Sequence, residues 1–106
     1  MTDEQIAKLK QAHPDAELSH IKDDNTGAEV VVKTPNDGEW RRFRSMSSDD
    51  AQRANALRTL VIACVVHPAP AEFMAMLERK PGLAETFGNK LVEIAGVSLA
   101  TTVRKL

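Results

Sequence analysis

Apolar residues near the start of the chain recur every three positions from Ile6 to Ala12. This spacing places them on one face of a helix. Thr2 and Gln5 have the spacing of a capping box, in which each side chain accepts a hydrogen bond from the other residue's backbone N–H. The pattern predicts a helix that begins after Thr2 and ends before Pro14, because proline disfavours helical geometry in the preceding residue.

The next segment has the pattern of a β-hairpin. Residues 16–22 and 28–34 fit strands, and the second is rich in β-branched residues. Between them, DDNTG at 23–27 favours a turn, since Asp, Asn and Gly tolerate the required backbone angles. The second strand holds three consecutive valines, at 30–32. Successive strand residues point to opposite faces, so this run predicts that both faces of the strand are covered.

Residues 34–46 fit two different structures. Asn36 and Glu39 have capping-box spacing, which predicts a helix start. The large apolar residues that follow at intervals of three are Trp40, Phe43 and Met46. We favour a short helix with an aromatic face, because in a strand the two aromatic rings would point to opposite faces. The alternative is a third strand, with residues 36–38 as a hairpin turn.

Residues 45–66 are predicted to form the longest helix. Ser47 or Ser48 can cap it, and two aspartates follow in the first turn. The apolar residues of its three-four rhythm are Ala54, Leu57, Val61 and Cys64. Residues 60–66 are all apolar, which predicts a helix end that is buried on every side.

Prolines and glycines divide the rest of the chain. His67 and Pro68 end the long helix, and Pro70 suits the first turn of a new one over residues 71–80. A last helix is predicted over 83–95, where Gly96 is placed to terminate it.

Together these elements predict an α+β fold. A helix and a β-hairpin, with two or three antiparallel strands, come first, and a C-terminal bundle of three to four helices follows. Residues 1–96 are expected to form a single domain. Residues 97–106 have weak periodicity, so we expect a C-terminal tail that is partly ordered at best.

Composition restricts the function classes. The chain has 106 residues, 42% of them apolar and 27% charged, with a formal net charge of −1. This charge balance disfavours nucleic acid or an anionic membrane as the main partner. One cysteine cannot form an internal disulfide, the first residues lack a signal-peptide pattern, and the longest apolar run is far too short to span a membrane. We therefore expect a cytoplasmic protein.

Cys64 and His67 are the first candidates for chemistry, since they are three positions apart. A structural zinc site needs about four ligands, and the chain offers one cysteine and three histidines without paired spacing. A cysteine nucleophile would need a partner base and a third orienting group. We interpret Cys64 as a small core residue and His67 as part of the helix break. No catalytic, cofactor or metal site is predicted, and the protein is not expected to be an enzyme.

The sequence EWRRFR, at residues 39–44, is the best candidate for a binding surface. Its aromatic and basic members are Trp40, Arg41, Arg42, Phe43 and Arg44. Tryptophan and arginine are favoured at protein interfaces, and the same cluster fits a small nucleic-acid-binding regulator that uses charge and stacking. A third interpretation is that the two rings are buried in a core short of aromatics, with the arginines solvated beside them.

Three stretches resemble a family of small bacteriophage tail assembly chaperones. VVVKTPNDGEWRRFRSM resembles a strand followed by K-x-P and an amphipathic segment, and NALRTLVIACVVHP resembles a helix ending in Cys and a short break. LERKPGLAETFGNKLVEIAG resembles the closing helix of that family. The resemblance covers residues 28–96, contains no catalytic motif and transfers no functional residue.

The resemblance implies a non-enzymatic protein that binds the long tape-measure protein of a phage tail inside the bacterial host cell. It would keep this partner soluble while tail-tube subunits assemble around it. Such binding needs an exposed apolar or mixed surface. Met46, Met74 and Met76 suit an adaptable surface because methionine repacks easily, although each also fits a gap in the core. Self-association of the protein is left open.

Overall fold

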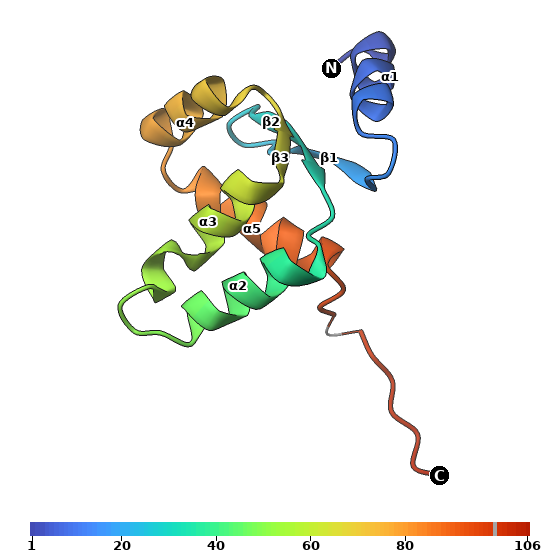
Figure 1. Ribbon diagram of the computed structural model, residues 1–106, viewed down its shortest axis with the longest axis vertical. Coiled ribbons are helices and arrows are strands. Elements are labelled where there is room, and N and C mark those ends of the chain that lie inside the picture. The colour runs from blue at the N-terminus through green and yellow to red at the C-terminus, as the bar shows by residue number, and fades with distance from the viewer. Residues whose placement is uncertain (99) are drawn as a thin grey trace.

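In the computed structural model, which describes residues 1–98 and 100–106, three antiparallel strands form a sheet. The N-terminal helix lies on one side of this sheet, apart from the later helices (Figure 1). The α+β class predicted from the sequence is therefore confirmed. In chain order the elements are α1 (Asp3–Ala12), β1 (Leu18–Lys22), β2 (Glu29–Lys33), α2 (Asp37–Ser47), a 3₁₀ turn (Arg53–Asn55), α3 (Ala56–Cys64), β3 (Val65–His67), α4 (Pro70–Arg79) and α5 (Leu83–Ile94).

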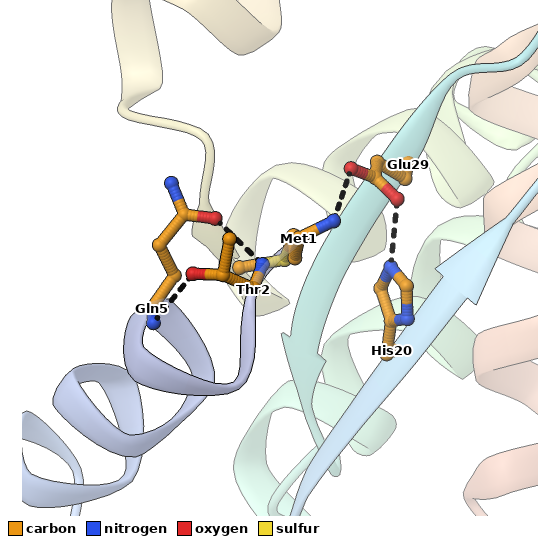
Figure 2. Close-up of polar contacts among 5 residues, drawn as sticks. All are labelled: Met1, Thr2, Gln5, His20 and Glu29. Atoms are coloured by element: carbon orange, nitrogen blue, oxygen red, sulfur yellow. Dashed lines mark hydrogen bonds and ion pairs between the residues drawn. The ribbon is translucent and has the colours of Figure 1, made fainter.

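The first helix begins with the predicted capping box. The backbone N–H of Gln5 donates to Thr2 Oγ1 at 3.2 Å, and the Thr2 N–H donates to Gln5 Oε1 at 2.9 Å (Figure 2). The amine of Met1 lies 3.0 Å from Glu29 Oε1, and His20 Nε2 lies 3.1 Å from the other carboxylate oxygen. Helix α1 is thereby tied to β1 and β2 at its N-terminal end, and none of its residues is fully buried.

The central strand β2 carries the three valines. Val30, Val31 and Val32 are all buried, so the prediction that both faces of this strand are covered is confirmed. β1 pairs with β2 in a register that sets Leu18 opposite Lys33. The turn between them closes through Gly27, whose φ of +76° lies in the left-handed region that favours glycine.

The third strand is not the segment considered from the sequence. Residues 37–47 form α2, which confirms the helix and shows the hairpin alternative to be wrong. Its capping box joins Asn36 and Glu39, as their spacing predicts, with bonds of 2.8 and 3.0 Å. The third strand is instead β3, which pairs with β2 at Val31 and Val32.

The prediction of one long helix over residues 45–66 is wrong. Helix α2 ends at Ser47, a turn and the 3₁₀ segment follow, and α3 begins only at Ala56. Local side-chain bonds compete with the helical ladder here: Ser48 Oγ donates to the Arg44 carbonyl, and the Asp49 carboxylate accepts from the Ala51 N–H. Residues 65–67 leave the helix because β-branched valines can pair with the free edge of β2.

The second half of that segment is not buried on every side either. Leu60, Val61 and Cys64 are buried, whereas Ile62 is 44% exposed and Ala63 is also exposed. One strip of α3 therefore faces solvent with an apolar surface.

The last two helices follow the prediction closely. Pro70 occupies the first turn of α4, and Phe73 and Leu77 are buried on one face. Helix α5 packs on α3 and buries Leu83, Phe87 and Leu91. Gly96, with φ of +111°, ends it.

The C-terminal segment follows α5 without regular structure. Residues 97–98 and 100–106 form neither helix nor strand, and all are exposed. Position 99, which belongs to the predicted tail, lies outside the described residues. In Figure 1 this segment leads away from the helices, on the side where α2 and α5 lie.

Candidate functional site

Helix α2 presents the predicted aromatic pair at its contact with the core. The rings of Trp40 and Phe43 have centroids 5.2 Å apart and are tilted by 41°. Both side chains are half-buried, and Phe43 packs against the core cluster. The neighbouring Arg41, Arg42 and Arg44 are exposed. The rings therefore serve mainly to attach α2, and only part of their surface remains open to a partner.

A groove runs between α2 and α3, and we call it the α2–α3 groove. Its volume is about 480 Å³. Its lining includes Glu39, Arg42 and Phe43 from α2 and Leu60, Ile62 and Ala63 from α3. Leu60 is buried at its floor, and Ile62 and Ala63 are exposed apolar side chains on its wall.

A second groove lies on the other side of Phe43, and we call it the α2–α5 groove. It has a volume of about 420 Å³ and includes Trp40, Arg44, Leu57 and Val92 in its lining. Phe43 lines both grooves and forms the ridge between them. Two apolar hollows thus flank α2, each with an arginine beside it.

The three predicted arginines differ in their partners. Arg41 Nε lies 3.0 Å from the Asp37 carboxylate, one helical turn away. Arg42 and Arg44 make no ion pair with any residue that the structure describes. Two of the three guanidinium groups therefore remain available to a partner.

Glu39 holds the N-terminal end of α2 against the sheet. Its carboxylate accepts from Lys33 Nζ on β2 and from the backbone N–H of Asn36. Burial works against ionisation of Glu39, but these hydrogen bonds outweigh it and hold its pKa below the usual value. The carboxylate that lines the α2–α3 groove is therefore already engaged within the protein.

Because the pKa of Glu39 is lower in the folded chain, its charge stabilises the fold at pH values above the unfolded-state pKa of about 4.3. That contribution is lost as the pH falls through the folded-state pKa. Glu39→Gln is expected to lower the free energy of unfolding by about 1 kcal/mol at pH 7. Urea unfolding at pH 7 and in acid should show the difference from wild type narrowing below pH ~4. A difference that is independent of pH, or equal to that of exposed Glu78→Gln, would contradict this role.

Met74 and Met76 do not join the α2 residues. Both are half-buried on α4, where Met76 packs against the core and lines a hollow beside Glu72. Helices α4 and α2 lie at opposite ends of the helical half in Figure 1. The residues predicted as one partner surface thus fall into two separate places.

Cys64 and His67 lie at a junction in the core. Cys64 ends α3 and is fully buried, while His67 pairs with Val31 in the sheet. Among the described residues, no group of three or more His, Cys, Asp or Glu side chains is placed to hold a metal ion. Desolvation raises the pKa of the Cys64 thiol to about 11.

A thiol reagent is expected to label native Cys64 very slowly. At pH 8 a pKa near 11 leaves only about one thiol in a thousand ionised, and burial restricts access further. The rate should rise at least ~100-fold in denaturant, where the pKa returns to about 8.5. Rapid, complete labelling of the folded chain would show that the site is open.

Sequence reasoning missed two features of this surface. Ile62 belongs to a run of seven apolar residues, so nothing in the sequence indicates that it is exposed. Only the contacts that α3 makes in the fold decide which of its faces is buried. The Lys33–Glu39 pair joins residues six positions apart on different elements. The Asn36–Glu39 spacing predicted the start of α2, but it did not indicate that Lys33 would pair with Glu39.

Comparison with known proteins places the chain in a family. A family model described as a domain of unknown function (DUF6848) matches residues 5–104. The chain belongs to the DUF6848 family. None of the curated proteins matches it.

The fold of this DUF6848 chain also occurs in a solved structure. It is similar to the uncharacterised protein rbstp2171 from Bacillus stearothermophilus, with a TM-score of 0.79 and 23% sequence identity. The match covers 93% of this chain and 99% of that one. At this identity the similarity shows a shared fold. Among the helices described in the DUF6848 chain, none has the length and apolar character to cross a membrane.

Proposed function

We propose that the protein is a non-enzymatic assembly chaperone or adaptor, which binds a partner protein at the α2–α3 groove. One observation carries the proposal: Ile62 is 44% exposed beside the half-buried Phe43, at an apolar hollow between two helices. Exposed apolar side chains that line a groove are typical of interaction sites. Arg42, an exposed cation at the edge, adds a residue type favoured at interfaces.

The resemblance to tail assembly chaperones supplies a candidate partner, the tape-measure protein of a phage tail. A groove between two helices suits a helical segment of such a partner, because an amphipathic helix can lay its apolar side chains between them. In this proposal the protein acts in the host cytoplasm, covers apolar surface of the partner and releases it during assembly.

Co-expression with a tape-measure protein tests the proposal. The partner is expected to remain soluble and to elute with the protein as one complex on gel filtration. Ile62→Glu should remove the complex, because it places a charge on the apolar wall of the groove. If the partner stays insoluble and no complex elutes with the wild-type chain, the proposed chaperone role is wrong.

The second candidate is a nucleic-acid-binding regulator, favoured by Arg42 and Arg44, which form no ion pair with a described residue. The geometry of the rings argues against it, since Trp40 and Phe43 contact each other and are half-buried instead of forming an open stacking platform. A salt-sensitive gel shift that disappears when Arg41, Arg42 and Arg44 are all replaced by alanine would favour this candidate. We expect no shift in low salt.

A further inference from the structure

The charged side chains around the α2–α3 groove indicate the charge of the partner that it binds. Over residues 37–64, each carboxylate makes a hydrogen bond or an ion pair within the protein. Asp37 pairs with Arg41, Asp50 pairs with Arg53, Glu39 accepts from Lys33, and Asp49 accepts from the Ala51 N–H. Three arginines of the same region, Arg42, Arg44 and Arg58, make no ion pair with a described residue. Of these, Arg42 lines the α2–α3 groove, whereas Arg44 and Arg58 line neighbouring hollows. Among the described residues that line the α2–α3 groove, the charged side chain without an ionic partner is therefore the cation Arg42.

The shape and lining of the α2–α3 groove suit a helical segment. Its two walls are helices, and residues 39–43 and 59–63 each span about one helical turn, or ~6 Å. That length accommodates apolar side chains that are three or four positions apart on a helix. Along the α3 wall, Leu60, Ile62 and Ala63 are apolar, and Thr59 adds a single hydroxyl group, so this wall offers little to a phosphate.

We infer that the α2–α3 groove receives an amphipathic helix with acidic flanks, whose apolar side chains contact Phe43 and Ile62 and whose carboxylates face Arg42. This inference rests on the proposed function and names the chemistry of the partner. Helix-in-groove binding places apolar anchors in the hollow. Opposite charges at the rim then select the partner and its orientation.

The charge of Arg42 also disfavours a second copy of this chain as the partner in the α2–α3 groove. The most exposed apolar side chains are those of the C-terminal segment, where Val103 is 91% and Leu106 103% exposed. Arg104 and Lys105 lie between them. If this segment entered the groove of another copy, its cations would meet Arg42, and like charges at close range oppose binding.

Two synthetic peptides test the inference against the full chain. Both carry leucines at i, i+3, i+4 and i+7. One has glutamates on the flanks of this stripe, and the other has lysines at the same positions. In fluorescence anisotropy at low salt the acidic peptide is expected to bind at least ~5-fold more tightly than the basic one. This preference should decrease in ~1 M salt, where the screening length is about 3 Å.

Three variants identify the site of binding. Arg42→Glu should reverse the preference between the peptides, and Ile62→Glu should weaken the acidic peptide more than ~10-fold. Arg79→Glu changes an exposed arginine on α4 and should leave both affinities unchanged. Equal affinity for the two peptides, no binding of the acidic peptide, or an Arg42→Glu variant that keeps the acidic preference would overturn the inference.

Other occupants give different results. If the wild-type chain is a dimer and Ile62→Glu makes it a monomer, the groove binds a second copy of the chain. If the chain shifts a nucleic acid in a gel and Ile62→Glu does not change this, the arginines bind nucleic acid. Either result overturns the inference. A full-length partner whose binding needs Ile62 but ignores the charge at Arg42 would overturn the acidic-helix inference alone and leave the proposed function intact.

Discussion

Replacing Phe87 by alanine is expected to lower the free energy of unfolding by about 3–5 kcal/mol. The Phe87 side chain is 0% exposed and is among the largest fully buried side chains of the chain. It lies on the face of α5 that joins the core cluster with Leu83 and Leu91. The chain has only four aromatic residues and no tyrosine. The remaining aliphatic side chains cannot refill the volume of a phenyl ring without shifting whole helices.

Urea unfolding of Phe87→Ala and of Thr86→Ala provides the comparison. Thr86 is the preceding residue of α5, and its side chain is exposed. Its replacement should change the unfolding free energy by no more than about 0.5 kcal/mol. If Phe87→Ala also lost less than about 1 kcal/mol, the cluster around α5 would not be the centre of the core.

Gly88→Val is expected to destabilise the fold by about 2–3 kcal/mol because α3 and α5 approach closely at this glycine. A Cβ atom at position 88 would lie 3.0 Å from both Cβ and Cδ2 of Leu57. The Leu57 Cβ is fixed to the α3 backbone, so rotation of its side chain cannot relieve the contact. The two helices would have to separate, and the packing of the core cluster would loosen.

Two alanine variants make this prediction specific to the α3–α5 contact. Gly38 lies in the first turn of α2, where an added Cβ atom would lie an ordinary 3.5 Å from Asn36 Oδ1. Gly38→Ala should therefore stabilise the chain by up to ~1 kcal/mol through helix propensity. Gly88→Ala also raises helix propensity, but its added Cβ atom would contact Leu57. It should therefore stabilise the fold less than Gly38→Ala does, or destabilise it. Equal stabilisation by both would show that the helices are not in close contact.

Local signals in the sequence predicted most helix starts and ends. The capping boxes at Thr2–Gln5 and Asn36–Glu39, Pro70 at the start of α4 and Gly96 after α5 all act through neighbouring residues. Such short-range chemistry is readable without the fold.

The errors arose where distant contacts decide the structure. Residues 65–67 became a strand because β2 offers an edge to pair with, and nothing within the run of apolar residues reveals that edge. The break between α2 and α3 was misread because SSDD can either cap a helix or interrupt one. The predicted surface was found only in part for the same reason: the arginines and rings of α2 were identified, while Ile62, on the facing helix, was assigned to the core.

Binding of a partner through the apolar wall of the α2–α3 groove is the central proposal for this protein. The most direct measurement is the affinity of a purified tape-measure segment for the wild-type chain, Ile62→Glu and Val103→Glu. Val103 is more exposed than Ile62 but lies on the C-terminal segment, outside the groove. We predict that Ile62→Glu weakens binding more than ~10-fold and that Val103→Glu leaves it unchanged. Equal affinities for all three chains, or a loss confined to Val103→Glu, would contradict the proposal.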